Sequence, residues 1–293
     1  MDFSKLNGKI FFNNRFINSR DAKIHVLNHS LHFSSSVFEG IGVYKGKPLF
    51  LKEHLLRLKK SAKIMKLTMN HSTEQLVSIC QKLISKNKIN DGYIRPLVFR
   101  SSHSMSPETS LCKSQIAIAA WKWGKLFNKP SLSLAISNYP KLNKHIYPIN
   151  AKSSGGYQTS VLARADLENS QFDDCLMLDL NRNIAETSAC NIFWLNKDIL
   201  FTPKDHAILN GITRQCILQL CKLNKIKFKI GNFKLKDIYS AEHVFITGTA
   251  AEIQTIDKIK KKKFKKNSKL IDFFKSEYES IKKKSPNLIK DLK

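Results

Sequence analysis

Arginine is scarce in this chain of 293 residues, which has 8 Arg against 42 Lys. Acidic residues are also few, so the formal net charge is +27. A basic protein can gain from counterion release on a polyanion, but these lysines are spread along the whole chain. Nucleic acid is therefore not the expected partner. The densest run, Lys258 to Lys266, predicts a solvated loop or hairpin, with a polyanion-binding patch as the alternative.

No apolar run approaches the length of a membrane span, and the N-terminus lacks the apolar core of a signal peptide. The six cysteines show no C-x-x-C spacing and lie mostly inside apolar segments. We therefore expect reduced thiols, a cytoplasmic location, and neither a disulfide framework nor a metal site. The glycine-rich pieces match neither a dinucleotide fingerprint nor a Walker loop. The length allows a large core in one or two domains.

In the first part of the chain, alternating apolar residues and turn formers predict strands at 9–18, 22–27, 37–44, 93–100 and 115–121. Between them, apolar residues at steps of three and four from Leu51 to Met65 predict one helix face. Ser72 and Gln75 have the spacing of a capping box, which predicts the start of a second helix.

Residues 123–131 carry turn formers and predict a connection between a first domain, 1–122, and a second domain, 132–293. The same reasoning predicts strands in the second domain near 132–138, 175–180, 191–195, 199–202, 226–230 and 243–247. Helices are expected near 156–169, 213–224, 235–240 and 268–283. This irregular interleaving predicts an α+β fold rather than a doubly wound sheet.

One lysine differs from the others in its neighbours. Lys152 precedes a Gly-Gly pair and Tyr157, and an acid, Glu186, follows downstream. Further on come a helix start at 209–214 and a small-residue loop at 247–252. A lysine amine, an acid and two loops of phosphate size are the parts that hold and use pyridoxal 5'-phosphate, PLP. The pattern predicts a PLP enzyme.

Six segments strengthen this prediction because they follow one another in the order and spacing of a known family. They are 29–40, 54–63, 93–97, 151–157, 209–214 and 247–252. The chain resembles the class IV, fold type IV, aminotransferases, and most closely the bacterial branched-chain amino-acid aminotransferases. The resemblance covers roughly residues 7–257. It implies a two-domain fold like that of D-amino-acid aminotransferase, with a small α/β N-terminal domain and a larger barrel-like C-terminal domain.

The resemblance implies a role for each matching residue around the cofactor. Lys152 would form the imine with PLP and move the proton of the substrate, which requires a neutral amine with a pKa well below about 10.4. Glu186 would pair with the pyridine nitrogen, and Tyr157 would hydrogen-bond the phenolic oxygen. The phosphate would be held by Arg57, Gly211, Ile212, Thr213 and Thr249, and Leu209 would also bind the cofactor. Ordinary structural roles remain the alternative: a surface lysine, a strand-end acid, a core tyrosine, a helix cation and a turn.

The substrate pocket follows from the same resemblance. Strand alternation puts Tyr93 and Arg95 on one face. Tyr93 would bind the α-carboxylate and Arg95 the distal carboxylate of glutamate, although a buried ion pair would also explain them. The remaining substrate contacts would come from Phe38, Phe33 of the partner subunit, Thr249 and Ala250.

The implied activity is transamination between leucine, isoleucine or valine and 2-oxoglutarate, giving branched 2-oxo acids and L-glutamate. Small-molecule substrates and a homodimer or homohexamer are the implied partners. A D-amino-acid transaminase or an aminodeoxychorismate lyase on the same fold would share Lys152 and Glu186 but would not need Arg95. A basic polyanion-binding protein on an inherited enzyme fold is the alternative from another class.

The chain also departs from the family pattern around the substrate. Gly42 stands where many relatives carry arginine, Phe33 replaces a common tyrosine, and Leu126 falls near another position often held by tyrosine. These departures leave the order of preference among the three branched amino acids open.

Overall fold

The computed structural model describes residues 2–124 and 126–292. Packing divides these residues into two compact units. Unit 1 comprises 2–124, 151–155 and 282–288, and unit 2 comprises 126–150, 156–281 and 289–292. The domain boundaries expected from the sequence stay a prediction. Met1, Lys125 and Lys293, which fall within those expected ranges, lie outside the described residues.

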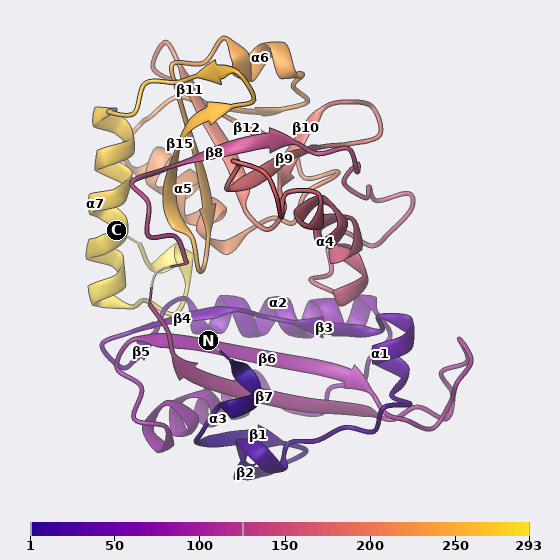
Figure 1. The fold of residues 1–293 in the computed structure, drawn as a ribbon. Coiled ribbons are helices and arrows are strands. Elements are labelled where there is room, and N and C mark those ends of the chain that lie inside the picture. Colours follow the sequence, from indigo (N-terminus) through magenta and orange to yellow (C-terminus); the bar gives the residue numbers. More distant parts are fainter. Residues whose placement is uncertain (1, 125, 293) are drawn as a thin grey trace. The chain divides into compact units, whose positions relative to one another are not determined.

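Unit 1 is built around an antiparallel sheet with strands in the order β2-β1-β7-β6-β4-β5, and β3 also pairs with β6 (Figure 1). The strands are β1 (Lys9–Phe12), β2 (Arg15–Asn18), β3 (Ser36–Phe38), β4 (Ile41–Tyr44), β5 (Lys47–Pro48), β6 (Gly92–Arg100) and β7 (Ser114–Lys122). The helices are α1 (His29–Phe33), α2 (Leu51–Ile64) and α3 (Thr73–Lys86).

The core of unit 1 lies between one face of this sheet and helices α2 and α3. Leu55 of α2 and Leu83 of α3 share a buried cluster with Ile94 and Val98 of β6. Because side chains alternate along a strand, the odd-numbered residues of β6 point to the other face. Tyr93 and Arg95 therefore lie on the face of the sheet opposite the helices.

Both helices of unit 1 that the sequence predicts are confirmed. The buried residues of α2 follow the predicted helix face from Leu51. At the start of α3, the backbone N–H of Ser72 donates to Gln75 Oε1 at 2.7 Å. The backbone N–H of Gln75 donates to Ser72 Oγ at 3.1 Å, which completes the capping box.

Three strand predictions need correction. The span 9–18 is a hairpin, because Asn13 and Asn14 both have positive φ angles, 44° and 72°, as a tight turn requires. No strand forms at 22–27, where the apolar side chains are exposed and have no sheet to pack against. The span 37–44 is interrupted at Gly40, where a Cβ would lie 1.7 Å from Tyr93 Oη. Helix α1 was not predicted.

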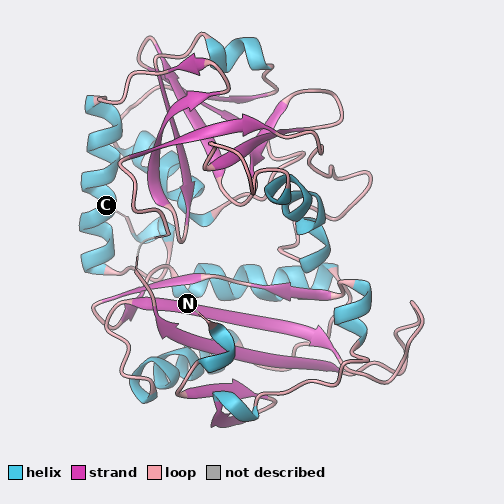
Figure 2. Cartoon of the chain, in the orientation of Figure 1, coloured by secondary structure: helices cyan, strands magenta, loops and turns pink. Residues whose placement is uncertain are grey.

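Unit 2 contains a mixed sheet in the order β10-β9-β8-β15-β14-β11-β12-β13, curled like half a barrel, and helices lie beside it (Figure 2). The strands are β8 (Ser131–Ile136), β9 (Asp174–Leu178), β10 (Ile184–Thr187), β11 (Asn191–Asn196), β12 (Ile199–Pro203), β13 (Phe228–Gly231), β14 (His243–Gly248), β15 (Glu252–Ile259) and β16 (Lys262–Lys263). The helices are α4 (Gln158–Ala165), α5 (Ile212–Leu223), α6 (Leu235–Tyr239) and α7 (Lys269–Lys284).

The predicted helices of unit 2 are confirmed, although α4 is shorter than the expected span 156–169. Strands β10 and β15 were not predicted, because β10 has only four residues and the isoleucines of β15 (Ile253, Ile256 and Ile259) are three positions apart instead of two. The basic run from Lys258 to Lys266 contains the hairpin of β15 and β16, as the sequence predicts. Within the described part of the chain, each helix is too short or too polar to cross a bilayer.

Candidate functional site

Lys152 is fixed to unit 1 through its backbone. Its N–H donates to Ser61 Oγ of α2 at 3.0 Å, and its carbonyl accepts from the N–H of Phe38 at 3.0 Å. The side chain is partly buried, and its Nζ lies 4.9 Å from the centre of the Phe38 ring. The amine therefore has a defined position on the face of the sheet away from the α2–α3 core.

The electrostatic surroundings of Lys152 favour an uncharged amine. Burial, followed by the positive charge of Arg57, lowers its pKa from 10.5 to about 8, while Glu39 acts in the opposite direction. A larger fraction of the amine is thus neutral near neutral pH than in an ordinary lysine. A neutral amine can act as a nucleophile or as a base, which a surface lysine cannot do efficiently.

Arg57 is oriented by a buried carboxylate. Glu39 is fully buried, and its two oxygens accept from Arg57 Nε at 2.6 Å and Nη2 at 2.9 Å. His54 Nδ1 lies 2.7 Å from Glu39 Oε2, and it must be the donor because a carboxylate only accepts. Burial lowers the pKa of His54, so Arg57 supplies the countercharge of Glu39. The planar guanidinium of Arg57 suits this two-point contact with a carboxylate.

Among the predicted substrate residues of unit 1, Arg95 lies beside the Phe38 ring that Lys152 also contacts, and it lies beside Tyr93 as well. Arg95 Cζ lies 4.9 Å from the centre of the Phe38 ring and 5.5 Å from that of Tyr93. Trp121 and Trp123, whose rings lie 5.4 Å and 4.7 Å from Tyr93, were not predicted from the sequence. Trp121 pairs with Tyr93 near the end of β7, and Trp123 follows two positions later. Because side chains two apart on a strand share a face, strand alternation could have indicated both tryptophans.

Phe33 lies at the end of α1, and 39% of it is exposed. Its ring lies 4.8 Å from that of His29. The role expected for it, in the pocket of a partner subunit, stays a prediction.

Glu186, on β10 of unit 2, is held from both of its oxygens. Lys141 Nζ lies 3.0 Å from Oε1, and Asn191 Nδ2 donates to Oε2 at 3.0 Å. Burial opposes the charge of Lys141, but Glu186 and Tyr157 together outweigh burial, so the pKa of Lys141 is raised. Lys141 Nζ also donates to Ser160 Oγ at 3.0 Å and lies 5.6 Å from the centre of the Tyr157 ring. The structure thus brings Glu186 and Tyr157 together around Lys141.

The segment before helix α5 is attached to the same group through Asn191. Asn191 Nδ2 donates to the carbonyl of Leu209 at 2.8 Å, and Asn191 Oδ1 accepts from the N–H of Gly211 at 3.1 Å. Gly211 is the N-cap of α5 and provides no side-chain cap. Ile212 and Thr213 begin the helix and are buried. The first turn of a helix has N–H groups without partners in the helix, which suit an anion.

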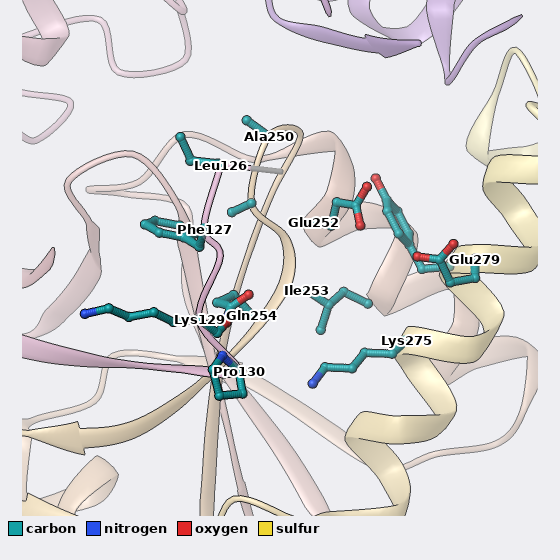
Figure 3. A pocket seen from close by; sticks show the side chains of 12 residues that line it. Leu126, Phe127, Lys129, Pro130, Ala250, Glu252, Ile253, Gln254, Lys275 and Glu279 are labelled. Carbon is teal, nitrogen blue, oxygen red and sulfur yellow. The ribbon is translucent and has the colours of Figure 1, made fainter. Parts of the chain in front are cut away.

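Thr213 is also supported from the last helix, because its side chain hydrogen-bonds Tyr278 of α7. Thr249 and Ala250 lie in the turn between β14 and β15. Ala250 lines a pocket of about 250 Å³ in unit 2. In Figure 3, Leu126 and Ala250 lie at one end of this pocket, and Glu279 extends into it from α7.

Arg214 has a structural role. Its Nη2 donates to the carbonyl of Pro203 at 2.9 Å, and its Nη1 donates to Asn210 Oδ1 at 2.8 Å. The guanidinium therefore holds the segment before α5 against the end of β12.

Comparison with known proteins identifies the family. The sequence model described as "Amino-transferase class IV" matches residues 36–259. The chain belongs to the class IV aminotransferase family.

Similar proteins within this family are named as branched-chain aminotransferases. The chain is 35% identical to a probable branched-chain-amino-acid aminotransferase of Rickettsia bellii over 93% of this chain and 95% of that one. Among solved structures, the branched-chain aminotransferase of Thermoproteus uzoniensis with norvaline has a TM-score of 0.91 and 27% identity, with 97% of each chain covered. The branched-chain amino acid aminotransferase of T.th. with pyridoxamine 5'-phosphate has a TM-score of 0.90 and 27% identity, again over 97% of each chain. The fold type IV expectation is confirmed.

Proposed function

We propose that this chain uses PLP to transfer an amino group between leucine, isoleucine or valine and 2-oxoglutarate. The observation that carries the proposal is the partly buried amine of Lys152, with its pKa lowered to about 8, beside the Phe38 ring that Arg95 also contacts. The branched-chain names of its relatives support the choice of substrate.

The residues present fit the cofactor. PLP supplies an electron-withdrawing ring that weakens a bond at the α-carbon of an amino acid. Helix α5 begins without a side-chain cap, which suits the phosphate, and we assign Arg57, Gly211, Ile212, Thr213 and Thr249 to that group. Leu209 is assigned to the cofactor site without a phosphate contact. Each carboxylate oxygen of Glu186 can accept more than one hydrogen bond, so its two contacts leave capacity for a ring nitrogen. Tyr157 is assigned to the phenolic oxygen.

Lys152 would carry out the proton transfer. As a neutral amine it can take a proton from the α-carbon of the amino acid and return a proton to the product. The hydrogen bond from its backbone to Ser61 and the contact of its amine with Phe38 restrict where that proton is delivered.

Arg95, Tyr93 and Phe38 would provide the selectivity. A guanidinium beside an aromatic ring can bind the distal carboxylate of a dicarboxylic acid, whereas the ring accepts an apolar side chain. The pair therefore suits an enzyme that alternates between 2-oxoglutarate and a branched 2-oxo acid. Thr249 and Ala250 are assigned to the α-carboxylate through their backbone N–H groups.

Two assays of the purified protein with PLP test this function. We expect turnover of L-leucine with 2-oxoglutarate and none of D-alanine. Arg95→Gln should raise the KM for 2-oxoglutarate by about 10-fold or more, because a charge-assisted bidentate contact is lost. The same variant should keep exchange between L-leucine and a branched 2-oxo acid. Lack of L-leucine turnover in the wild type would end the branched-chain proposal, and turnover of D-alanine would favour the D-amino-acid enzyme.

We also propose that the protein is a homodimer or homohexamer in the cytoplasm, where its buried thiols would stay reduced. Large apolar side chains are exposed along one segment of unit 1: Ile24, Val26, Leu27, Leu31 and Phe33. Exposed apolar groups gathered in this way favour association. Leu31→Lys should lower the molar mass measured by light scattering, whereas Leu111→Lys, at an equally exposed leucine elsewhere, should not. A monomeric wild type would contradict the proposal.

A further inference from the structure

One amide side chain joins the two parts of unit 2 that are assigned to opposite ends of the cofactor. Asn191 Nδ2 donates both to Glu186 Oε2 and to the carbonyl of Leu209. Asn191 Oδ1 accepts from the backbone N–H of Gly211. The residue is 5% exposed, so these bonds form away from water and each unmade bond would be costly.

Gly211 is shaped to receive this amide. A Cβ on Gly211 would lie 2.1 Å from Asn191 Oδ1, far closer than atoms can approach. The backbone of Gly211 has a φ of −64° and a ψ of 143°, which any residue adopts. Glycine is therefore required here by the contact with Asn191 and not by the backbone conformation.

We propose that Asn191 is a positioning residue that fixes the span between the carboxylate of Glu186 and the first turn of α5. The inference rests on the proposed function, because only a ligand held at both places uses a fixed span. Lys141 anchors the other oxygen of Glu186, and Ser160 in turn fixes Lys141. The carboxylate can therefore move little unless Asn191 moves with it.

A fixed span affects a long ligand more than its fragments. PLP has its ring nitrogen at one end and its phosphate at the other, so it binds well only when both sites are correctly spaced. Pyridoxal, which lacks the phosphate, and inorganic phosphate alone use one site each. The benefit of holding two ends at once is lost when geometry no longer allows both to be engaged.

The first experiment measures the dissociation constants of PLP, pyridoxal and inorganic phosphate for the wild-type protein and for Asn191→Ala. We expect PLP binding to weaken by about 10-fold or more, and the two fragments to change by less than about 3-fold. Asn196→Ala, on the same strand with only a 3.5 Å contact to Ser240, is the matched control and should bind PLP like the wild type. Equal losses for PLP and its fragments, or no loss of PLP, would overturn the positioning role.

The second experiment does not depend on the cofactor. Thermal unfolding is measured without PLP for Gly211→Ala, Asn191→Ala and the double variant. Gly211→Ala should lower the melting temperature strongly, but much less in the Asn191→Ala background, because the colliding oxygen is gone. If the losses of melting temperature in the two single variants add up in the double variant, the contact between Asn191 and Gly211 is refuted. If the wild type fails to bind PLP while these losses are non-additive, the proposed function fails and the contact stands.

Discussion

Lys152→Ala is expected to lower kcat for L-leucine by at least about 10⁴-fold, the largest effect of any single substitution in this chain. In the proposed function the lysine would combine two tasks, binding the cofactor covalently and moving the substrate proton as a base. Both tasks require an amine at the position beside Phe38, and there Lys152 also has a lowered pKa. The rate is measured by coupling formation of L-glutamate to a dehydrogenase.

Two controls separate this loss from a loss of folding. Lys144→Ala removes an exposed lysine from the same region of the sequence and should leave kcat unchanged. A small amine such as methylamine should restore part of the activity of Lys152→Ala, because it can take up the proton that the missing side chain carried. Turnover of Lys152→Ala at the wild-type rate would remove Lys152 from the reaction.

The catalytic candidates could be predicted from the sequence because they lie in short segments of unusual composition. Lys152 stands before two glycines in a chain where lysine is otherwise uninformative. The shared face of Tyr93 and Arg95 followed from strand alternation alone, and the contact between them confirms it. Patterns within a few residues are reliable because backbone geometry fixes them locally.

The residues that hold these candidates could not be predicted in the same way. Lys141 pairs with Glu186 across 45 positions of sequence, and nothing distinguishes it from the other lysines before the sheet is known. Asn191 is the first residue of a strand, and its contacts with Leu209 and Gly211 depend on how β11 lies beside the start of α5. Such contacts arise from tertiary packing, which short-range patterns do not encode.

The same limit explains the errors in the fold. The apolar residues at 22–27 predicted a strand, but their side chains are exposed, which is what a surface for a second subunit would require. The strand expected at 37–44 is interrupted because Gly40 must make room for the hydroxyl of Tyr93. In the second case a neighbour distant in sequence overrides the local preference, whereas in the first a strand pattern finds no partner strand within the described part of the chain.

Glu39→Gln is expected to lower the free energy of unfolding by about 3 to 5 kcal/mol at neutral pH, because it leaves the partly buried Arg57 and the buried His54 without their carboxylate. Glu39 is fully buried and bonded through both oxygens, so water cannot replace the lost contacts. The measurement is urea unfolding of the wild type and the variant. Glu74→Gln, at an exposed position in the first turn of α3, should cost less than about 1 kcal/mol.

The effect of Glu39→Gln should also depend on pH, and the direction is fixed by the pKa of Glu39. Burial would raise that pKa, but Arg57 and then His54 outweigh burial and hold it far below its ordinary value of 4.5. The folded state therefore keeps the carboxylate charged at pH values where the unfolded chain takes up a proton. Its contribution is complete above about pH 4.5 and shrinks as the pH falls further, so the wild type and Glu39→Gln should become more alike in stability towards about pH 3. A difference that stays constant over this range would show that packing, and not the charge of Glu39, stabilises the site around Arg57.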